Sequence, residues 1–420
     1  MTAGGGAARL RVALLTREYP PEVYGGAGVH VDYLSRELAK LMEVDVRAFG
    51  HQLLEAPNLK VRGFPVDPGQ FGCPKHLQSI FGALTRCVQF NAAGIDADVV
   101  HCHTWYTHLG GLLAKLTYGI PLVITIHSLE PLRPWKREQL GHGYDFSCWV
   151  ERTAIQRADA VVAVSRGTKE DVQRLFNISE DRIYIIYNGI DPDEYRPLEA
   201  RDQLARYGVD GAKPYALFVG RIARQKGIIH LVNAIEYLAA GTEVVLCAGA
   251  PDTPEIAAEM QGAVERVKAR RPDVRVVWIA EMVPKAAVYQ LYSHAGVFVC
   301  PSIYEPFGII NLEAMACETP VVASAVGGIK EVVVEGETGF LVPLKQYSES
   351  PFEAREPEKF ARDLAEKVNR LVGDEGLRKR MGQAGRRRAV EKFSWAAIAQ
   401  ETRKMYAELI ERHKQHTAAG

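Results

Sequence analysis

Residues 301–320 read PSIYEPFGIINLEAMACETP, and this stretch predicts how the second half of the chain folds. The apolar run before it, residues 295–300, is typical of a buried strand, and the prolines that follow stop strand pairing. An apolar segment typical of a helix comes next. Glu305 is therefore predicted to lie on a strand-to-helix turn. The first N–H groups of such a helix can bind an anion, and they belong to Gly308, Ile309 and Ile310.

A second carboxylate, Glu313, follows Glu305 in an E-x7-E pattern. It lies about a turn and a half into the predicted helix. Two acids beside an anion site suit a phosphorylated sugar, because carboxylates can hold sugar hydroxyls. The spacing by itself also fits one glutamate in a turn and another on a solvated helix face.

Short apolar runs alternate with segments of helical periodicity along the chain. Buried strands between amphipathic helices indicate parallel sheets covered on both faces. We therefore predict an α/β fold of two doubly wound Rossmann-like domains that face an interdomain cleft. The runs typical of strands are residues 11–16, 44–49, 98–103, 121–127, 159–165 and 182–188, then 215–220, 243–249, 274–280, 297–302 and 320–324.

A length of 420 residues suits two domains. The charged, proline-containing stretch 191–214 separates the two sets of strands. We predict a first domain over residues 1–195 and a second over 213–394. Ligands in such folds bind beyond the carboxyl ends of the strands, which places the expected site at those loops.

The composition excludes several classes of partner. Basic and acidic residues number 51 each, so no net charge attracts nucleic acid or an anionic membrane. The 7 cysteines form no C-x2-C pair and are typical of reduced thiols. No apolar run reaches the ~18 residues of a membrane span. We expect a cytoplasmic protein with no membrane partner.

Loops at predicted strand ends carry the candidate residues of the first domain. Gly25 and Gly26 precede a helix expected to begin near Val29, and they let the backbone approach a ligand. This loop is not a dinucleotide fingerprint, because Val31 occupies the third glycine position. His127 ends a very apolar strand, which fits either a core histidine or a site residue.

The segment 98–111 places His101 and His103 on one side of a strand. Alternate histidines can ligate a metal, but no third ligand is visible nearby, so we predict a polar strand tip and no metal. His103 and Trp105 are expected to approach the cleft. No other cofactor is predicted.

Two groups of cations could bind phosphate. Arg221 and Lys226, in the pattern G-R-x4-K-G, flank a loop before a helix and are typical of an anion clamp. The other group follows His127 and forms either a phosphate pocket or a solvated charged face. Its members are Arg133, Lys136 and Arg137.

The sequences that flank E-x7-E, PSIYEPFG and NLEAMACETPVVAS, resemble the glycogen-synthase-like family of retaining glycosyltransferases. The first loop, TREYPPEVYGGAGVHV, is similar to the actinobacterial branch, which includes ADP-glucose-dependent maltose-1-phosphate synthases. It lacks the lysine of the Lys-Thr-Gly-Gly-Leu loop in better-known glycogen synthases. The resemblance spans residues 10–413.

The resemblance implies a role for each candidate. Arg221 and Lys226 would stabilise the leaving diphosphate, Glu305 would hold glucose hydroxyls, and Glu313 the ribose. His127 would contact the sugar near the reacting carbon. The last helix, 395–413, would return to the first domain. Other donor contacts would come from Gly25, Gly26, Met282 and Val283, the last two beside the base.

We therefore expect a retaining glucosyltransferase that uses ADP-glucose. The acceptor would be glucose 1-phosphate, giving α-maltose 1-phosphate, and/or the non-reducing end of an α-1,4-glucan. Rival hypotheses are a glycogen synthase that acts only on glucan, a family member with another sugar-phosphate acceptor, a sugar-phosphate epimerase, a pyridoxal-phosphate phosphorylase and a non-catalytic nucleotide-sugar sensor. A homodimer is compatible with all of them.

Overall fold

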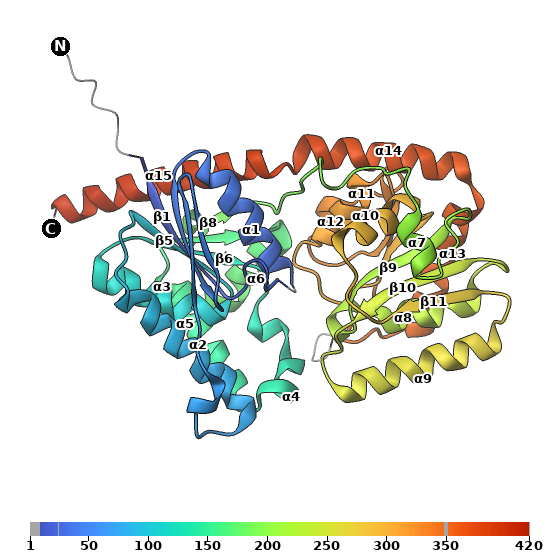
Figure 1. Ribbon diagram of the computed structural model, residues 1–420, viewed down its shortest axis with the longest axis horizontal. Helices are drawn as coiled ribbons and strands as arrows, with labels where there is room; N and C mark the ends of the chain where they lie inside the picture. The colour runs from blue at the N-terminus through green and yellow to red at the C-terminus, as the bar shows by residue number, and fades with distance from the viewer. Residues whose placement is uncertain (1–8, 24, 348–351, 420) are drawn as a thin grey trace, which may run out of the picture. The chain divides into compact units, whose positions relative to one another are not determined.

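The structure is a computed structural model that describes residues 9–23, 25–347 and 352–419, and the chain divides into two units (Figure 1). The first unit contains the described residues up to Asn188 together with those from Trp395 onward. The second unit runs from Gly189 to Ser394. Each is built on a parallel sheet, which confirms the predicted α/β class with two domains. No helix among the described residues is long and apolar enough to cross a membrane.

The first unit contains an 8-stranded sheet in the order β3-β4-β2-β1-β5-β6-β7-β8, parallel except for β3 against β4. Because β1 pairs with both β2 and β5, the strand order reverses direction between β1 and β5. Ligands of open α/β sheets bind at such a switch point. The strands are β1 Arg11–Thr16, β2 Glu43–Phe49, β3 Leu53–Ala56, β4 Leu59–Phe64, β5 Val99–His103, β6 Leu122–Ile126, β7 Ala160–Ala163 and β8 Ile183–Ile185.

Helices cover both faces of this sheet, with a buried apolar cluster on each side. The C-terminal helix α15 packs against α1 (Figure 1), and the two share one buried cluster. The ring of Trp395 stacks on that of Tyr33, with their centroids 5.8 Å apart. The longer helices of the unit are α1 Gly26–Ala39, α2 Lys75–Ala92, α3 Trp105–Tyr118, α4 Arg137–Leu140, α5 Gly143–Arg157, α6 Arg166–Phe176 and α15 Trp395–Ala419.

The second unit contains a 6-stranded parallel sheet in the order β11-β10-β9-β12-β13-β14, with its switch point between β9 and β12. The strands are β9 Tyr215–Arg221, β10 Glu243–Gly249, β11 Arg275–Ile279, β12 Val297–Cys300, β13 Val321–Ser324 and β14 Gly339–Val342. The helices are α7 Asp202–Arg206, α8 Ile228–Ala234, α9 Pro254–Arg270, α10 Lys285–His294, α11 Ile309–Ala316, α12 Ile329–Val332, α13 Pro357–Gly373 and α14 Glu375–Lys392.

The structure differs from the sequence expectations in two places. Strands β3, β4 and β14 were not predicted; β3 is exposed along its whole length and β4 alternates buried and exposed residues, so neither forms an apolar run. Helix α1 begins at Gly26 rather than near Val29, because Gly25 is extended and ends the preceding loop.

Candidate active site

The switch point of the second unit brings together the two loops that carry the strongest motifs. The loop after β9 contains Lys226, and the loop after β12 contains Glu305. Gly227 lies between them with a φ of +58°, and a Cβ there would lie 2.1 Å from the carbonyl oxygen of Pro301. Only glycine allows this approach. The N–H of Ile303 also donates to Gln225, at 3.0 Å.

Lys226 and Glu305 form an ion pair in these loops. The Nζ of Lys226 donates to Oε2 of Glu305 at 2.7 Å, and Ser302 donates to the same oxygen at 3.3 Å. Burial opposes the charged form of Lys226, but the attraction of Glu305 outweighs it and raises the pKa of the ammonium. The structure thus joins two residues that the sequence predicted for one site.

Arg221 also has an internal carboxylate partner. Its Nη1 donates to Oδ1 of Asp252 at 2.7 Å. Asp252 follows β10, and its own N–H donates to Ile222 at 3.0 Å. Sequence analysis did not identify Asp252, because nothing local marks a residue 31 positions away as a partner.

Glu313, in helix α11, is 8% exposed and is held by two tyrosines that were not predicted. Tyr195 donates to its Oε1 at 3.1 Å, and Tyr292 donates to its Oε2 at 2.9 Å. Burial raises the pKa of Glu313. The first N–H groups of α11, at Gly308, Ile309 and Ile310, are those for which a helix supplies no carbonyl partner.

The predicted base contacts lie at the edge of the same sheet. Met282 and Val283 follow β11, which β10 separates from β9. The side chain of Met282 is 82% exposed, and Val283 is half-buried.

In the first unit, the glycine-rich loop folds over Glu18, which sequence analysis also missed. The N–H of Gly25 donates to Oε2 of Glu18 at 2.9 Å, and Gly26 begins helix α1. A Cβ on Gly28 would lie 2.7 Å from the Cβ of Glu18. The glycines therefore let the loop pack on this carboxylate.

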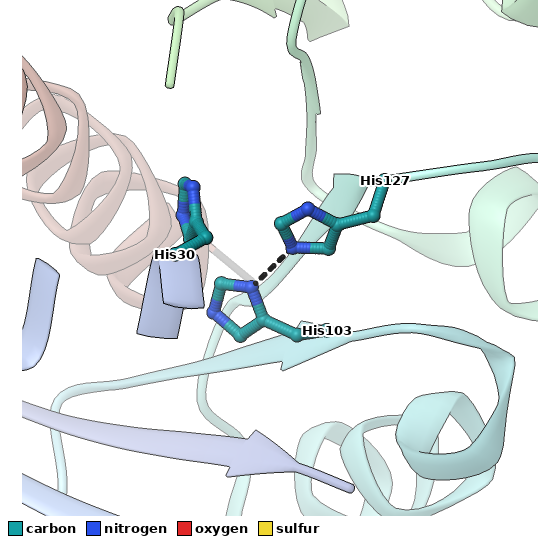
Figure 2. Close-up of side chains that lie close together, drawn as sticks. All are labelled: His30, His103 and His127. Carbon is teal, nitrogen blue, oxygen red and sulfur yellow. Dashed lines mark hydrogen bonds between the residues drawn. The ribbon is translucent and has the colours of Figure 1, made fainter. Parts of the chain in front are cut away.

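Three histidines meet near the switch point of the first unit (Figure 2). His103 ends β5, His127 follows β6, and His30 lies in α1. Nδ1 of His103 is 3.0 Å from Nε2 of His127, and Nδ1 of His30 is 2.5 Å from Oδ1 of Asn188. Burial lowers the pKa of each imidazole, that of His30 to about 4. All three are therefore neutral at pH 7.

The expectation that His101 and His103 together form a polar strand tip needs correction. His101 is held by the hydroxyls of Tyr406, at 2.5 Å, and Thr125, at 2.6 Å. The residues that join His103 come from other elements, and one of them, His30, was not recognised from the sequence as a neighbour of His103.

Trp105 lies in an apolar cluster rather than at an open surface. It is 4% exposed and packs with Ile80, Leu140 and Tyr144. Its ring stacks on Tyr106 at 4.2 Å. The more accessible ring of this pair belongs to Tyr106, which is partly buried and which the sequence analysis did not single out.

The three cations after His127 all lie near carboxylates of the same unit. Arg137 forms two hydrogen bonds with Asp145, at 2.9 and 2.5 Å. Arg133 and Lys136 lie 3.7 and 3.9 Å from Oε1 of the buried Glu130. These two distances exceed hydrogen-bond length, so their donors are not tightly held by Glu130.

Two further residues set the charge around this cluster. Burial raises the pKa of Glu151 well above its usual value, which favours its uncharged form, and the N–H of Glu130 donates to it at 2.8 Å. Arg17, directly after β1, lies 4.1 Å from the ring of Tyr106, and Lys136 lies 5.8 Å from the same ring. Two cations, Arg17 and Lys136, therefore lie over one aromatic ring.

Comparison with known proteins gives matches along nearly the whole chain. Residues 24–194 match the family Glycosyltransferase Family 4, and residues 200–351 match Glycosyl transferases group 1. The chain is 50% identical to alpha-maltose-1-phosphate synthase of Mycolicibacterium smegmatis, over 94% of this chain and 99% of that protein. The identity to the Mycobacterium tuberculosis protein of that name is 47%, over the same shares.

Two further matches are more distant. Glycogen synthase of Mycobacterium tuberculosis is 26% identical, over 94% of each chain. Among solved structures, sucrose-phosphate synthase of Thermosynechococcus elongatus has a similar fold, with a TM-score of 0.78 and 25% identity. That match covers 96% of this chain and 100% of the other.

Proposed function

The chain belongs to the glycogen-synthase-like family of glycosyltransferases, and from that premise we propose that it is a cytoplasmic enzyme that transfers glucose from ADP-glucose to glucose 1-phosphate. The product is α-maltose 1-phosphate. The observation that carries this proposal is the 50% identity to an alpha-maltose-1-phosphate synthase along almost the entire length of both proteins.

On the donor side, Arg221 and Lys226 bind the diphosphate. An ammonium group has three donors, so Lys226 can keep its bond to Glu305 and still donate to a phosphate oxygen. Glu305 holds hydroxyls of the transferring glucose. Glu313 accepts the ribose hydroxyls, because a carboxylate oxygen that already accepts one tyrosine proton has a further lone pair.

The remaining donor contacts are backbone groups. Gly25 and Gly26 bring the start of α1 close to the diphosphate, and the N–H groups of Gly308, Ile309 and Ile310 face its charge. The segment of Met282 and Val283 contacts the base. The preference for adenine over uracil is part of the proposal and rests on the family resemblance.

In the reaction, the bond between the glucose C1 and the diphosphate oxygen breaks, and a bond from C1 to the 4-hydroxyl oxygen of the acceptor forms on the same face. The acceptor proton passes to the leaving phosphate. Positive charge grows on the sugar ring and negative charge on the diphosphate, and Arg221 and Lys226 stabilise the latter. His127 contacts the sugar near C1 as a neutral imidazole.

On the acceptor side, Arg133 and Lys136 bind the phosphate of glucose 1-phosphate. Both are largely buried and share a single carboxylate, Glu130, at 3.7 and 3.9 Å. Since Glu151 favours its uncharged form, the group retains a positive charge that a neutral glucan end does not need. His103 and Trp105 act on the acceptor pocket indirectly. His103 positions His127, and Trp105 positions Tyr106.

Product analysis tests the proposal. Purified enzyme is incubated with ADP-glucose or UDP-glucose and with glucose 1-phosphate, glucose or glycogen, and the products are identified by mass spectrometry and NMR. We expect maltose 1-phosphate, with ADP-glucose as the better donor. Hydrogen bonds to charged groups contribute ~1.5–3 kcal/mol each, so glucose 1-phosphate is expected to exceed glucose at least tenfold in kcat/KM.

Variants of the cation cluster provide the matched control. Arg133→Ala and Lys136→Ala are expected to raise the KM for glucose 1-phosphate, whereas Arg137→Ala is not, because Arg137 is occupied by Asp145. Glycogen synthase activity is the second candidate, favoured by the 26% identity to such an enzyme. A better rate with glycogen at matched end concentration, or unchanged KM values in both variants, would establish that alternative.

A further inference from the structure

Three imidazole rings converge from three different elements of the first unit (Figure 2). The ring centroids of His30, His103 and His127 are separated by 5.3 Å (His30–His103), 4.7 Å (His30–His127) and 5.3 Å (His103–His127). One nitrogen from each lies within 4.8 Å of the others. His30 and His103 are buried, and His127 is partly exposed, so the group is open to solvent on one side.

These spacings fit a tetrahedral metal ion. Zinc binds imidazole nitrogen at about 2.0–2.1 Å, so two ligands at the tetrahedral angle lie about 3.3 Å apart. Nδ1 of His103 and Nε2 of His127 are 3.0 Å apart. Three ring centroids around such an ion would lie about 5 Å apart, close to the separations observed.

The third ligand is already oriented. Nδ1 of His30 lies 2.5 Å from Oδ1 of Asn188, an acceptor, so this nitrogen carries the proton and Nε2 keeps its lone pair. Within the described part of the chain, Nε2 of His30 is buried and has no hydrogen-bond partner. A carbonyl that fixes the second nitrogen of a histidine is the usual outer contact of a metal ligand.

We propose that His30, His103 and His127 form a binding site for a divalent transition-metal ion of the zinc type, and that the bound ion blocks glucose transfer. Imidazole suits zinc, copper and nickel, whereas magnesium and calcium prefer oxygen ligands. Three protein ligands leave the fourth position to water. The blocking effect rests on the proposed function, because the metal would bind the same side of the His127 ring that contacts the sugar.

Cobalt provides a readout that does not depend on activity. Full-length protein stripped with a chelator is titrated with Co²⁺ alone, and the visible absorption bands of tetrahedral cobalt are recorded. We expect saturation at one ion per chain. His30→Gln and His103→Gln each lose the bands. Asn188→Ala keeps all three ligands and is expected to bind about 10–100-fold more weakly.

His230→Gln is the matched control. His230 is also buried, and neither of its ring nitrogens has a partner in the described part of the chain, but it belongs to no such cluster. This variant keeps the full cobalt signal. Absence of tetrahedral bands in the wild type, or bands that persist in both His30→Gln and His103→Gln with folding verified by circular dichroism, would overturn the site.

Inhibition is measured separately. Zn²⁺ is expected to inhibit maltose 1-phosphate formation in the wild type over the concentration range in which it displaces Co²⁺ from the site, and less so in Asn188→Ala. Cobalt binding without inhibition of a turning-over enzyme would refute the blocking role and leave the metal site standing. Cobalt binding in a protein that turns over no acceptor would instead refute the proposed function.

Discussion

At the scale of single residues, three of the groups expected to bind the donor phosphates already form a hydrogen bond with a carboxylate of their own chain. Lys226 is paired with Glu305, Arg221 with Asp252, and the N–H of Gly25 with Glu18. Unpaired buried charges are costly, so such partners keep cations ordered at a defined position. The arrangement is a form of electrostatic preorganisation, because little reorganisation remains when charge develops on the leaving group.

Lys226→Ala tests this arrangement. Loss of a donor that stabilises a leaving group costs ~10²–10³ in kcat. It also leaves Glu305 buried without its cation, which costs about 3 kcal/mol in the free energy of unfolding. Steady-state kinetics and urea denaturation measure the two effects. The double variant Lys226→Met with Glu305→Gln is expected to recover stability but not activity.

Arg224→Ala is the control, since Arg224 lies in the same short turn and its Nη1 lies 3.9 Å from Oε1 of Glu353, beyond hydrogen-bond length. It is expected to leave kcat and stability nearly unchanged. If Lys226→Ala retained wild-type kcat, or if Arg224→Ala lost as much, the ion pair would have no special role in leaving-group stabilisation.

At the scale of elements, the turn that carries Glu305 is fixed by the turn that precedes α12. The N–H of Gly328 donates to the carbonyl of Glu305 at 3.0 Å. Gly327 has a φ of +48°, and a Cβ there would lie 2.0 Å from that same carbonyl oxygen. Gly327 and Gly328 thus set the position of Glu305, the acid proposed to hold the sugar.

Gly327→Ala is expected to destabilise the protein and reduce kcat. A left-handed alanine costs about 1–2 kcal/mol, and the contact with Glu305 adds a displacement of the turn. Gly336→Ala separates the two effects, because Gly336 also has a positive φ, of +74°, but no atom of the described residues lies within 4 Å of a Cβ placed there. It is expected to lose stability only, as measured by urea denaturation and kinetics. Equal kcat values for the two variants would contradict the role of Gly327.

The strands that the sequence patterns predicted are buried ones. All eleven predicted runs contain a strand, because a strand covered on both faces must be apolar along its length. The edge strand β3 and its neighbour β4 were missed, since β3 is fully exposed and β4 alternates buried and exposed residues. The start of α1 was misplaced because Gly26 gives no signal of helix, and only its position after the extended Gly25 decides it.

At the scale of the whole molecule, the sequence predicted the loops of the candidate site but not the partners within them. Strand ends converge at a switch point in any doubly wound sheet, so Lys226 and Glu305 could be assigned to one place. Asp252, Tyr195 and His30 could not, because their contacts depend on tertiary packing between distant segments. For the same reason, the sequence analysis treated Arg133 and Lys136 as cations without an internal partner, because it did not identify Glu130 and Glu151 as their neighbours.

Buried histidines of the first unit predict a loss of stability in mild acid. Burial lowers the pKa of His108 from 6.5 to about 3 and that of His30 to about 4. Between those values and 6.5, the unfolded chain binds protons that the folded chain does not, so stability rises with pH and is lost as pH falls. Glu151 acts in the opposite sense, because its raised pKa lets the folded state bind a proton more readily.

The variant His108→Leu isolates one of these groups. His108 is 1% exposed, and its ring nitrogens have no partner in the described part of the chain, so leucine removes a proton site and no hydrogen bond. We expect the wild type to lose stability faster than the variant as the pH falls. The difference between their free energies of unfolding should grow by about 1.4 kcal/mol per pH unit below 6.5. Urea denaturation from pH 7 to pH 5, followed by tryptophan fluorescence, measures the difference. His142→Gln, which changes a fully exposed side chain, is the comparison variant. Parallel profiles for His108→Leu and the wild type would show that His108 titrates alike in the folded and unfolded chain, and acid sensitivity would then have to come from another group.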